Sequence, residues 1–177
     1  MAVTCAAYLG MSLDGFIAGP NDELDWLEQV DKLEGEDFGY AEFMGSVDAL
    51  IMGRRTFETI ANLGVGWPYP LPVIVMSSSV TELPAEFAQC EVSANTPAAM
   101  ISEAESRGWS KLYIDGGQLV ASFLNEGLLD ELIVSVLPVA LGSGISLFAG
   151  LDGSEWLNHQ STRTFDNGMV QLRYTKN

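Results

Sequence analysis

The stretch KLYIDGGQL, residues 111–119, already contains the unit from which the rest of the fold can be worked out. An apolar run ends at Asp115, Gly116 and Gly117 follow, and a helical pattern then continues over residues 118–125. A strand that passes through a glycine turn into a helix is typical of α/β proteins. The two glycines also leave the amide groups at the start of the helix accessible, so that a phosphate can approach the backbone closely.

Other short apolar runs occur on both sides of this stretch. Runs that are continuous rather than alternating are typical of strands covered on both faces. They occupy residues 2–10, 49–52, 72–76 and 131–139, with a weaker run at 89–93. Candidate helices lie between them, at residues 38–47, 56–62 and 97–107, the last with Thr96 as its N-cap. The alternation predicts an α/β fold with a mostly parallel central sheet and helices on both faces.

The C-terminal segment has a different pattern. Residues 160–165 and 169–175 alternate polar and apolar side chains around the sequence Asp-Asn-Gly at 166–168. Asn-Gly is the strongest short signal for a hairpin, so we expect the sheet to end in an antiparallel hairpin. Because no linker, repeat or low-complexity segment interrupts the chain, we expect residues 1–177 to form a single domain.

Composition excludes several classes of protein. The 24 acidic residues outnumber the 8 Lys and Arg residues and give a net charge of −16, which argues against binding to nucleic acids or anionic membranes. No apolar run is long enough to span a membrane, and no basic segment opens the chain, so we expect a cytoplasmic protein. Cys5 and Cys90 lie in apolar runs, where we expect buried free thiols. With one His and two Cys we expect no metal site.

The segment IMGRRTFE, residues 51–58, carries the clearest binding signal. A strand ends at Gly53, and a helix begins with Arg54, Arg55 and Thr56 in its first turn. The N-terminus of a helix favours anions, so cations are unfavourable there for the helix itself. Two of only five arginines nevertheless lie at this point, which predicts a phosphate ligand. The alternative is that both arginines pair with neighbouring carboxylates.

Two further polar features follow apolar runs. Ser77 and Ser78 come after the run 72–76, at the strand end where open α/β sheets bind ligands, although a run of serines also often forms a turn. Asp14 follows the first strand, where it either shapes a turn or faces a substrate. Residues 21–42 hold nine carboxylates, which predicts a solvated surface, but Trp26 within this segment needs an apolar surface to pack against.

In their order, four segments of the chain resemble the dihydrofolate reductase-like superfamily. They are SLDGFIAG (12–19), DALIMGRRTFE (48–58), PVIVMSSS (72–79) and LYIDGGQLVASFLNEGLLDELIVSVLPVALGSGISLF (112–148). The resemblance is to the branch that includes the C-terminal reductase domain of the bifunctional riboflavin biosynthesis protein, here as a stand-alone chain. It implies a three-layer fold, a homodimer, NADPH as cofactor, and hydride transfer to a small pyrimidine- or pteridine-like substrate, as in 5-amino-6-(5-phosphoribosylamino)uracil reductases.

The resemblance also implies roles for individual residues. It matches Gly53, Arg54, Arg55 and Thr56 to a cofactor-binding motif at a helix start, in which the two arginines hold the 2′-phosphate of NADPH and Thr56 lies behind the pyrophosphate. It places Ser77 and Ser78 near the adenine ribose phosphate, and Leu9 and Gly10 at the nicotinamide carboxamide. The pyrophosphate would be covered by Gly116, Gly117, Gln118 and Leu119.

The substrate side is less well defined by the resemblance. Asp14 is the first candidate for a catalytic proton donor and also for contact with the substrate. Glu23, Asp25 and Trp26 belong to ELDWL, which resembles the segment that binds the pterin in dihydrofolate reductases. Trp26 either forms part of the substrate wall or pins a loop to the core. Asp115 stands where the branch usually has glutamate, a position compatible with a structural role.

The chain also departs from the riboflavin branch. Phe16 stands where that branch commonly has a basic residue, and Lys32, Arg54 and Arg55 are the only cations before residue 107. A second phosphate site would therefore lack cations, and we expect a substrate other than the phosphorylated pathway intermediate. Three alternatives stay open: a dihydrofolate reductase, a non-catalytic protein that binds NADPH or another small ligand, and an interaction protein with vestigial motifs.

Overall fold

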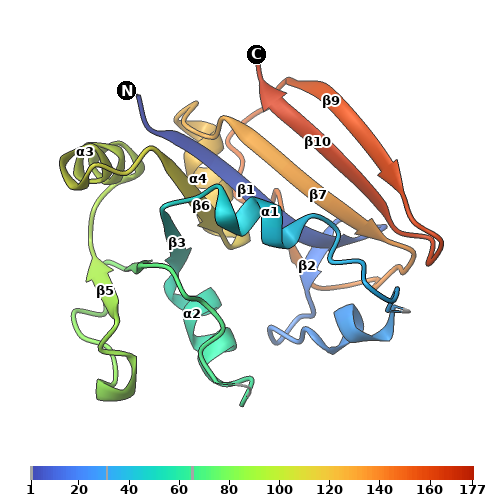
Figure 1. Ribbon diagram of the computed structural model, residues 1–177, viewed down its shortest axis with the longest axis horizontal. Helices are drawn as coiled ribbons and strands as arrows, with labels where there is room; N and C mark the ends of the chain where they lie inside the picture. The colour runs from blue at the N-terminus through green and yellow to red at the C-terminus, as the bar shows by residue number, and fades with distance from the viewer. Residues whose placement is uncertain (1, 31, 65) are drawn as a thin grey trace.

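The computed structural model describes residues 2–30, 32–64 and 66–177. Its central element is an eight-stranded sheet in the order β5-β4-β3-β6-β1-β7-β10-β9 (Figure 1). The first six strands in this order run parallel to one another. They are β5 (Cys90–Ser93), β4 (Val73–Met76), β3 (Ala49–Gly53), β6 (Lys111–Asp115), β1 (Thr4–Ser12) and β7 (Glu131–Leu137). The predicted mostly parallel sheet is thus confirmed.

The sheet ends in the predicted antiparallel hairpin. Strands β9 (Leu157–Thr164) and β10 (Val170–Lys176) pair with each other, and β10 pairs with β7. A second, two-stranded sheet joins β2 (Phe16–Ala18) to β8 (Ile145–Ser146). The sequence did not predict this small sheet, because strands of two or three residues are too short to show a period.

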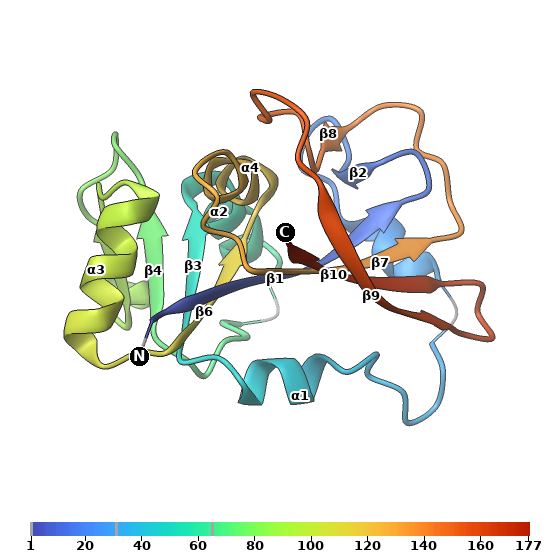
Figure 2. The same cartoon turned by 90° about the horizontal axis from the view of Figure 1, so that it is seen from above.

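Helices cover both faces of the main sheet, as predicted. Figure 2 shows α1 on one side and α3 and α4 on the other. Their bounds are α1 (Tyr40–Gly45), α2 (Arg54–Ala61), α3 (Pro97–Arg107) and α4 (Gly117–Asn125), with short 3₁₀ helices η1 (Asp25–Gln29) and η2 (Ala85–Phe87). The predicted N-cap of α3 is also confirmed, since the Thr96 hydroxyl accepts a hydrogen bond from the amide of Ala99.

Strand β6 separates two hydrophobic clusters. Leu112 and Ile114 belong to the cluster that contains the buried side chains of α3 and α4. Tyr113 points the other way, into the cluster that contains Phe43 of α1 and Phe57 of α2. Because side chains alternate along a strand, Asp115 at the end of β6 falls on the same face as Tyr113.

Some predicted boundaries differ from those observed. The expected helix 38–47 is shorter because Phe38 and Gly39 adopt left-handed conformations, with φ of 61° and 85°. Strand β7 ends at Leu137 because the next residue is a proline, which has no N–H to donate. Helix α2 begins at Arg54, as the segment IMGRRTFE predicts, and not at residue 56, where the apolar pattern placed its start.

Two other expectations bear on the chain as a whole. Cys5 and Cys90 are buried and free, as expected, and burial raises their pKa values to about 12 and about 11. Within the described ranges, no helix has the length and apolar character needed to cross a membrane.

The topology creates a crevice at the carboxyl ends of the parallel strands. Strands β3 and β6 are neighbours in the sheet, but α2 continues from β3 and packs with the cluster of Phe57, whereas α4 continues from β6 into the opposite cluster. Open α/β sheets bind ligands at the point where the helices after two neighbouring strands leave for opposite faces of the sheet.

Candidate functional site

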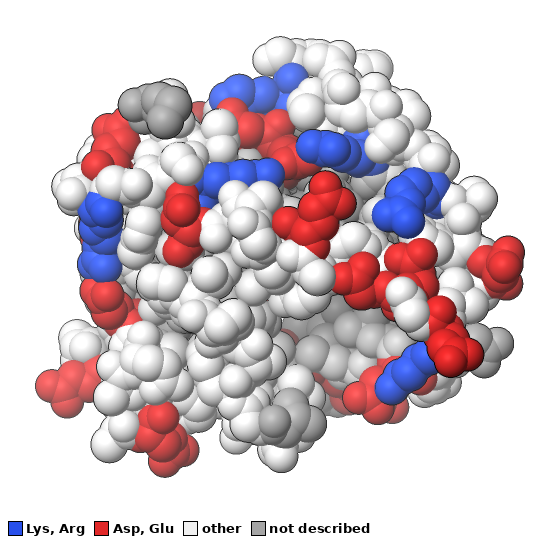
Figure 3. Space-filling model, in the orientation of Figure 1, with Lys and Arg blue, Asp and Glu red and all other residues white. Residues whose placement is uncertain are grey.

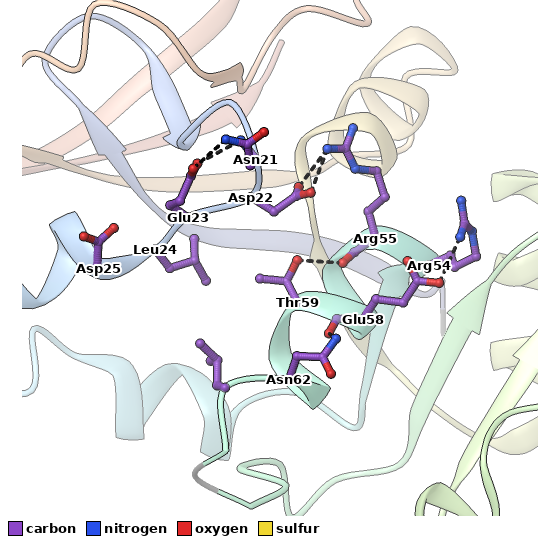
Figure 4. Close-up of a pocket in the computed structure, with 11 residues that line it drawn as sticks. Asn21, Asp22, Glu23, Leu24, Asp25, Arg54, Arg55, Glu58, Thr59 and Asn62 are labelled. Atoms are coloured by element: carbon purple, nitrogen blue, oxygen red, sulfur yellow. Dashed lines mark hydrogen bonds and ion pairs between the residues drawn. The ribbon is translucent and has the colours of Figure 1, made fainter.

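A cavity of about 680 Å³ opens at this edge, between the segment 21–25 and helix α2 (Figure 4). The surface that carries α1 is hollowed between α2 and η1, and acidic side chains gather along one side of the hollow (Figure 3). This volume lies in the range of small-ligand sites. The cavity is lined by Asn21, Asp22, Glu23, Leu24, Asp25, Arg54, Arg55, Glu58, Thr59, Asn62 and Leu63. It therefore brings Arg54 and Arg55 together with Glu23 and Asp25, as members of one site.

Both arginines are paired with carboxylates. Arg54 Nη1 donates to Glu58 Oε1 at 2.9 Å, within α2. Arg55 Nη2 donates to both carboxylate oxygens of Asp22, at 2.9 and 2.8 Å, and the two guanidinium groups point to different sides (Figure 4). The alternative expectation from the sequence, carboxylate pairing, is thus the arrangement present in the structure. Both arginine side chains are about half exposed, and exposed ion pairs contribute at most about 1 kcal/mol, so another anion can replace either carboxylate.

The turn between β3 and α2 touches the turn between β6 and α4. Gly116 has a φ of +96°, and a Cβ at this position would lie 2.4 Å from the hydroxyl oxygen of Thr56. Gly53, in contrast, faces open space, since a Cβ there would meet nothing within 4 Å. The two turns are thus in contact with each other. The Thr56 side chain covers the backbone at Gly116, whereas the backbone at Gly53 is left uncovered.

The other predicted residues of the turn between β6 and α4 are Gly117, Gln118 and Leu119. A Cβ on Gly117 would come within 2.9 Å of the Ile17 side chain, so α4 begins tightly against β2. Gln118 is exposed, whereas Leu119 is buried in the core, where only its backbone can serve a ligand.

Ser77 and Ser78 lie next to the start of α2. Met76 is level with Gly53 in the sheet, which places the serines after β4 at the same edge as the arginines. The Ser77 hydroxyl accepts hydrogen bonds from the amides of Ser79 and Val80, so Ser77 forms a turn, while Ser78 is exposed.

At the end of β1, the two predicted residues differ in surroundings. Leu9 is buried in the core. Gly10 faces the α1 side, where the Leu27 side chain of η1 lies 2.9 Å from the position of a Cβ. Leu27 therefore covers the strand at the point where the resemblance places the nicotinamide, a contact that the sequence did not reveal.

Asp14 shapes the turn after β1. Its carboxylate accepts hydrogen bonds from the Ser12 hydroxyl at 2.7 Å and from the amides of Leu141 and Gly142 at 3.0 and 2.7 Å. These bonds lower its pKa to about 2. A carboxylate that stays ionised to such low pH is poorly suited to donate a proton near neutrality, so this geometry argues against the catalytic role expected for Asp14.

The predicted substrate residues of ELDWL are also turned away from the cavity centre. The Glu23 carboxylate accepts hydrogen bonds from the Asn21 backbone and side chain, both at 2.8 Å, and these bonds lower its pKa. Asp25 is exposed and points away from α2 (Figure 4). Trp26 is buried beside Leu137 and Met169, so of its two expected roles the structure shows the pinning of a loop to the core.

Asp115 is a titratable group for which the sequence indicated no more than a structural role. It is level with Met52 of β3, at the end of the central strand, and burial raises its pKa to about 6 although the Gly116 amide donates to it. Its charge, second to burial, raises the pKa values of Tyr40 and Tyr69. The feature of the sequence that could have indicated Asp115 is its position at a strand end, directly before two glycines.

Comparisons with known proteins agree with this architecture. The chain is 34% identical to the Bacillus subtilis protein YwjB, over 96% of this chain and 95% of that protein. A Shewanella sp. PV-4 protein assigned to riboflavin biosynthesis has a crystal structure that matches with a TM-score of 0.93 and 32% identity, over 98% of this chain and 99% of that one.

A more distant structure shows the fold alone. The Thermotoga maritima diaminohydroxyphosphoribosylaminopyrimidine deaminase/5-amino-6-(5-phosphoribosylamino)uracil reductase matches with a TM-score of 0.74 at 16% identity, over 99% of this chain and 57% of that one.

The family model of the RibD C-terminal domain matches residues 4–171. With nearly the whole chain covered by that model and by relatives above 30% identity, the protein belongs to the RibD C-terminal domain family.

Proposed function

We propose that this protein is an NADPH-dependent reductase that transfers a hydride to a small heterocyclic substrate of the pyrimidine or pteridine type. The family and the reductases among its structural neighbours support a reductase. The observation that carries the proposal is the position of Arg54 and Arg55, which line a cavity between the segment 21–25 and helix α2, next to the uncovered backbone of Gly53 at the end of β3.

The residues of this edge suit a dinucleotide with an additional phosphate. Arg54 and Arg55 would hold the 2′-phosphate, and the amides near Gly53 and Gly116 would hold the pyrophosphate. Bound NADPH supplies the hydride. Because the chain carries a charge of −16, binding must rest on short-range contacts rather than on long-range attraction.

The ion pairs in the structure permit such binding. A hydrogen bond to a charged group contributes about 1.5–3 kcal/mol, whereas an exposed ion pair contributes at most about 1 kcal/mol. A phosphate that accepts several such bonds would therefore offset the loss of Glu58 or Asp22, and contact with both guanidinium groups would require the two side chains to turn toward each other.

Asp115 is the residue to which we assign proton donation. It lies on the α1 face, as does the side of Gly10 that Leu27 covers, and it keeps its proton to about pH 6. When a hydride reaches the carbon of a C=N or C=O bond, the nitrogen or oxygen needs a proton, which a protonated carboxyl supplies. Leu27 and the tyrosines beside Asp115 would help to exclude water from the reacting bond.

The test is NADPH oxidation with a panel of aminouracils, dihydropteridines, quinonoid compounds and dihydrofolate. Turnover of an unphosphorylated aminouracil or pteridine supports the proposal, and preference for dihydrofolate would indicate a dihydrofolate reductase. Tight NADPH binding without oxidation would indicate a binding protein. If NADPH does not raise the melting temperature, an interaction protein is favoured, since a ligand at 100 times its Kd adds about 2.7 kcal/mol of stability.

The cofactor assignment has its own test. Arg54→Ala should weaken NADPH binding by about 10- to 100-fold and NADH binding much less, because the contact is to the phosphate that NADH lacks. Isothermal titration calorimetry measures both constants. Arg107→Ala is the control, since Arg107 pairs with Glu91 and Glu103 away from the cavity. Equal losses for NADPH and NADH would refute the role of Arg54.

A further inference from the structure

The ion pair of Arg55 differs in kind from that of Arg54. Glu58 lies one turn after Arg54 in the same helix, so their pair is local to α2. Asp22 is 33 residues away from Arg55 in the sequence and belongs to the opposite wall of the cavity (Figure 4). The Arg55–Asp22 pair therefore ties two walls of the cavity together.

The turn that carries Asp22 is built to present this side chain. Asp22 has a φ of 65°, in the left-handed region that few residues other than glycine adopt. Its amide donates to the carbonyl of Gly19, the Gly19 amide donates to the carbonyl of Glu23, and the Glu23 carboxylate binds Asn21. The turn 19–23 is thus closed by its own hydrogen bonds, and Asp22 is the member that reaches across to α2.

We propose that Asp22 is a specificity-determining residue whose carboxylate competes with a ligand phosphate for Arg55. This inference rests on the proposed function, in which Arg55 binds the 2′-phosphate. A phosphate at Arg55 would lie beside the Asp22 carboxylate, and the repulsion between the two anions would release the turn 19–23 from α2. A ligand without that phosphate leaves the pair intact, and its ribose hydroxyl can donate to Asp22 instead.

The pair also sets how strongly the site favours a phosphorylated ligand. Each phosphate-bearing ligand must break the Arg55–Asp22 contact before it gains its own, so Asp22 lowers affinity for this class alone. Because both side chains are partly exposed, the cost is that of an exposed ion pair, which corresponds to about a 2- to 5-fold change in Kd.

The first experiment compares Asp22→Asn with Asp25→Asn. Both remove one negative charge from the same wall of the cavity, but only Asp22 contacts Arg55 in the structure. Asparagine tolerates the left-handed conformation, so the turn should be retained, and circular dichroism checks this. The probes are adenosine 2′,5′-bisphosphate and adenosine 5′-monophosphate, each titrated by calorimetry.

We expect Asp22→Asn to bind the bisphosphate about 2- to 5-fold more tightly than wild type, and to bind the monophosphate no more tightly than wild type does. Asp25→Asn should change the two constants little and equally. An Asp22→Asn protein that gains no more than Asp25→Asn would overturn this inference while leaving the proposed function intact. Failure of the wild type to bind the bisphosphate at all would overturn both.

The second experiment follows the turn itself by hydrogen exchange. In the wild type, bisphosphate should speed exchange in a peptide covering residues 19–24 and slow it in one covering 53–58. In Asp22→Asn the first peptide should exchange fast without ligand and respond little to it. If bisphosphate instead protects residues 19–24 in the wild type, the phosphate does not displace Asp22, and the inference is wrong.

Discussion

Asp14 follows β1 and Asp115 is the last residue of the neighbouring parallel strand β6, so both lie at the same edge of the sheet, but the pKa values of their carboxyl groups shift in opposite directions. The pKa of Asp14 falls to about 2 because a hydroxyl and two amides donate to it. The pKa of Asp115 rises to about 6 because burial removes water from it. At neutral pH the first is a fixed anion, and the second is close enough to its pKa to exchange protons.

This contrast shows that location at the ligand edge does not make a carboxylate an acid catalyst. What decides is whether hydrogen bonds stabilise the charged form or desolvation disfavours it. Where the surroundings of two carboxyl groups at one edge shift their pKa values in opposite directions, the group with the raised pKa is the candidate acid. The turn after β1 therefore holds a structural carboxylate, and the junction after β6 holds the candidate acid.

The largest expected effect is that of Asp115→Asn, which tests the chemical side of the contrast. An amide cannot donate a carboxyl proton, so kcat should fall at least about 100-fold, while the Kd for NADPH changes little. In the wild type kcat should decline above about pH 6 as Asp115 ionises, and in the variant this decline should be absent. A pH–rate profile measures both. Asp115→Glu should restore part of kcat.

Stability provides the control for the same variant. The pKa of Asp115 is 3.8 in its ordinary state and about 6 in the fold, so the unfolded chain ionises first and wild-type stability falls as pH rises from about 4 to 6. Asp115→Asn lacks this fall and should become more stable than wild type above pH 6, by at most about 3 kcal/mol. Loss of stability together with full activity would instead assign Asp115 the structural role.

The next effect concerns the backbone that holds Asp115. Gly116→Ala should lower the free energy of unfolding by about 2–4 kcal/mol, because it adds a strained φ of +96° and a clash with Thr56. Gly15→Ala, in the turn after β1, has a similar φ of +91° but open space around it, and should cost only about 1 kcal/mol. Urea denaturation measures both.

A double variant separates strain from the clash. Thr56→Ala removes the hydroxyl that a Cβ on Gly116 would meet, so it should recover part of the stability lost in Gly116→Ala. If the Gly116 and Gly15 variants lose the same stability, the β6 junction is no tighter than the β1 turn, and the contrast between the two regions weakens.

Most of the fold was predictable from the sequence for a local reason. Five of the six parallel strands lie on mainly apolar runs, with β5 (Cys90–Ser93) the weaker one, and Thr96 and Gly108 directly flank α3 as its caps. Features that depend on partners distant in the sequence were not predictable. The β2–β8 pair and the packing of Trp26 against Leu137 and Met169 arise only when segments far apart in the chain meet.

The same distinction between local patterns and distant contacts applies to the residues of the candidate site. Arg54 and Arg55 stood out because two cations in the first turn of a helix are locally unfavourable. Nothing in the local pattern indicated that Asp22 would pair with Arg55, or that Leu27 would cover Gly10. The different pKa values of Asp14 and Asp115 also depend on tertiary contacts, so the sequence alone could not indicate which of the two is better suited to donate a proton.

The smallest expected effect is that of Asp14→Asn, which tests the supporting side of the contrast. The variant loses the charge that Ser12, Leu141 and Gly142 bind, so its melting temperature at pH 7 should fall by a few degrees. Because the folded pKa lies below 3.8, this stabilisation is present above pH 4 and is lost as pH falls towards 2, where the two proteins should converge. The wild-type pH–rate profile should persist in the variant. Loss of kcat without loss of stability would reverse the assignment of the two aspartates.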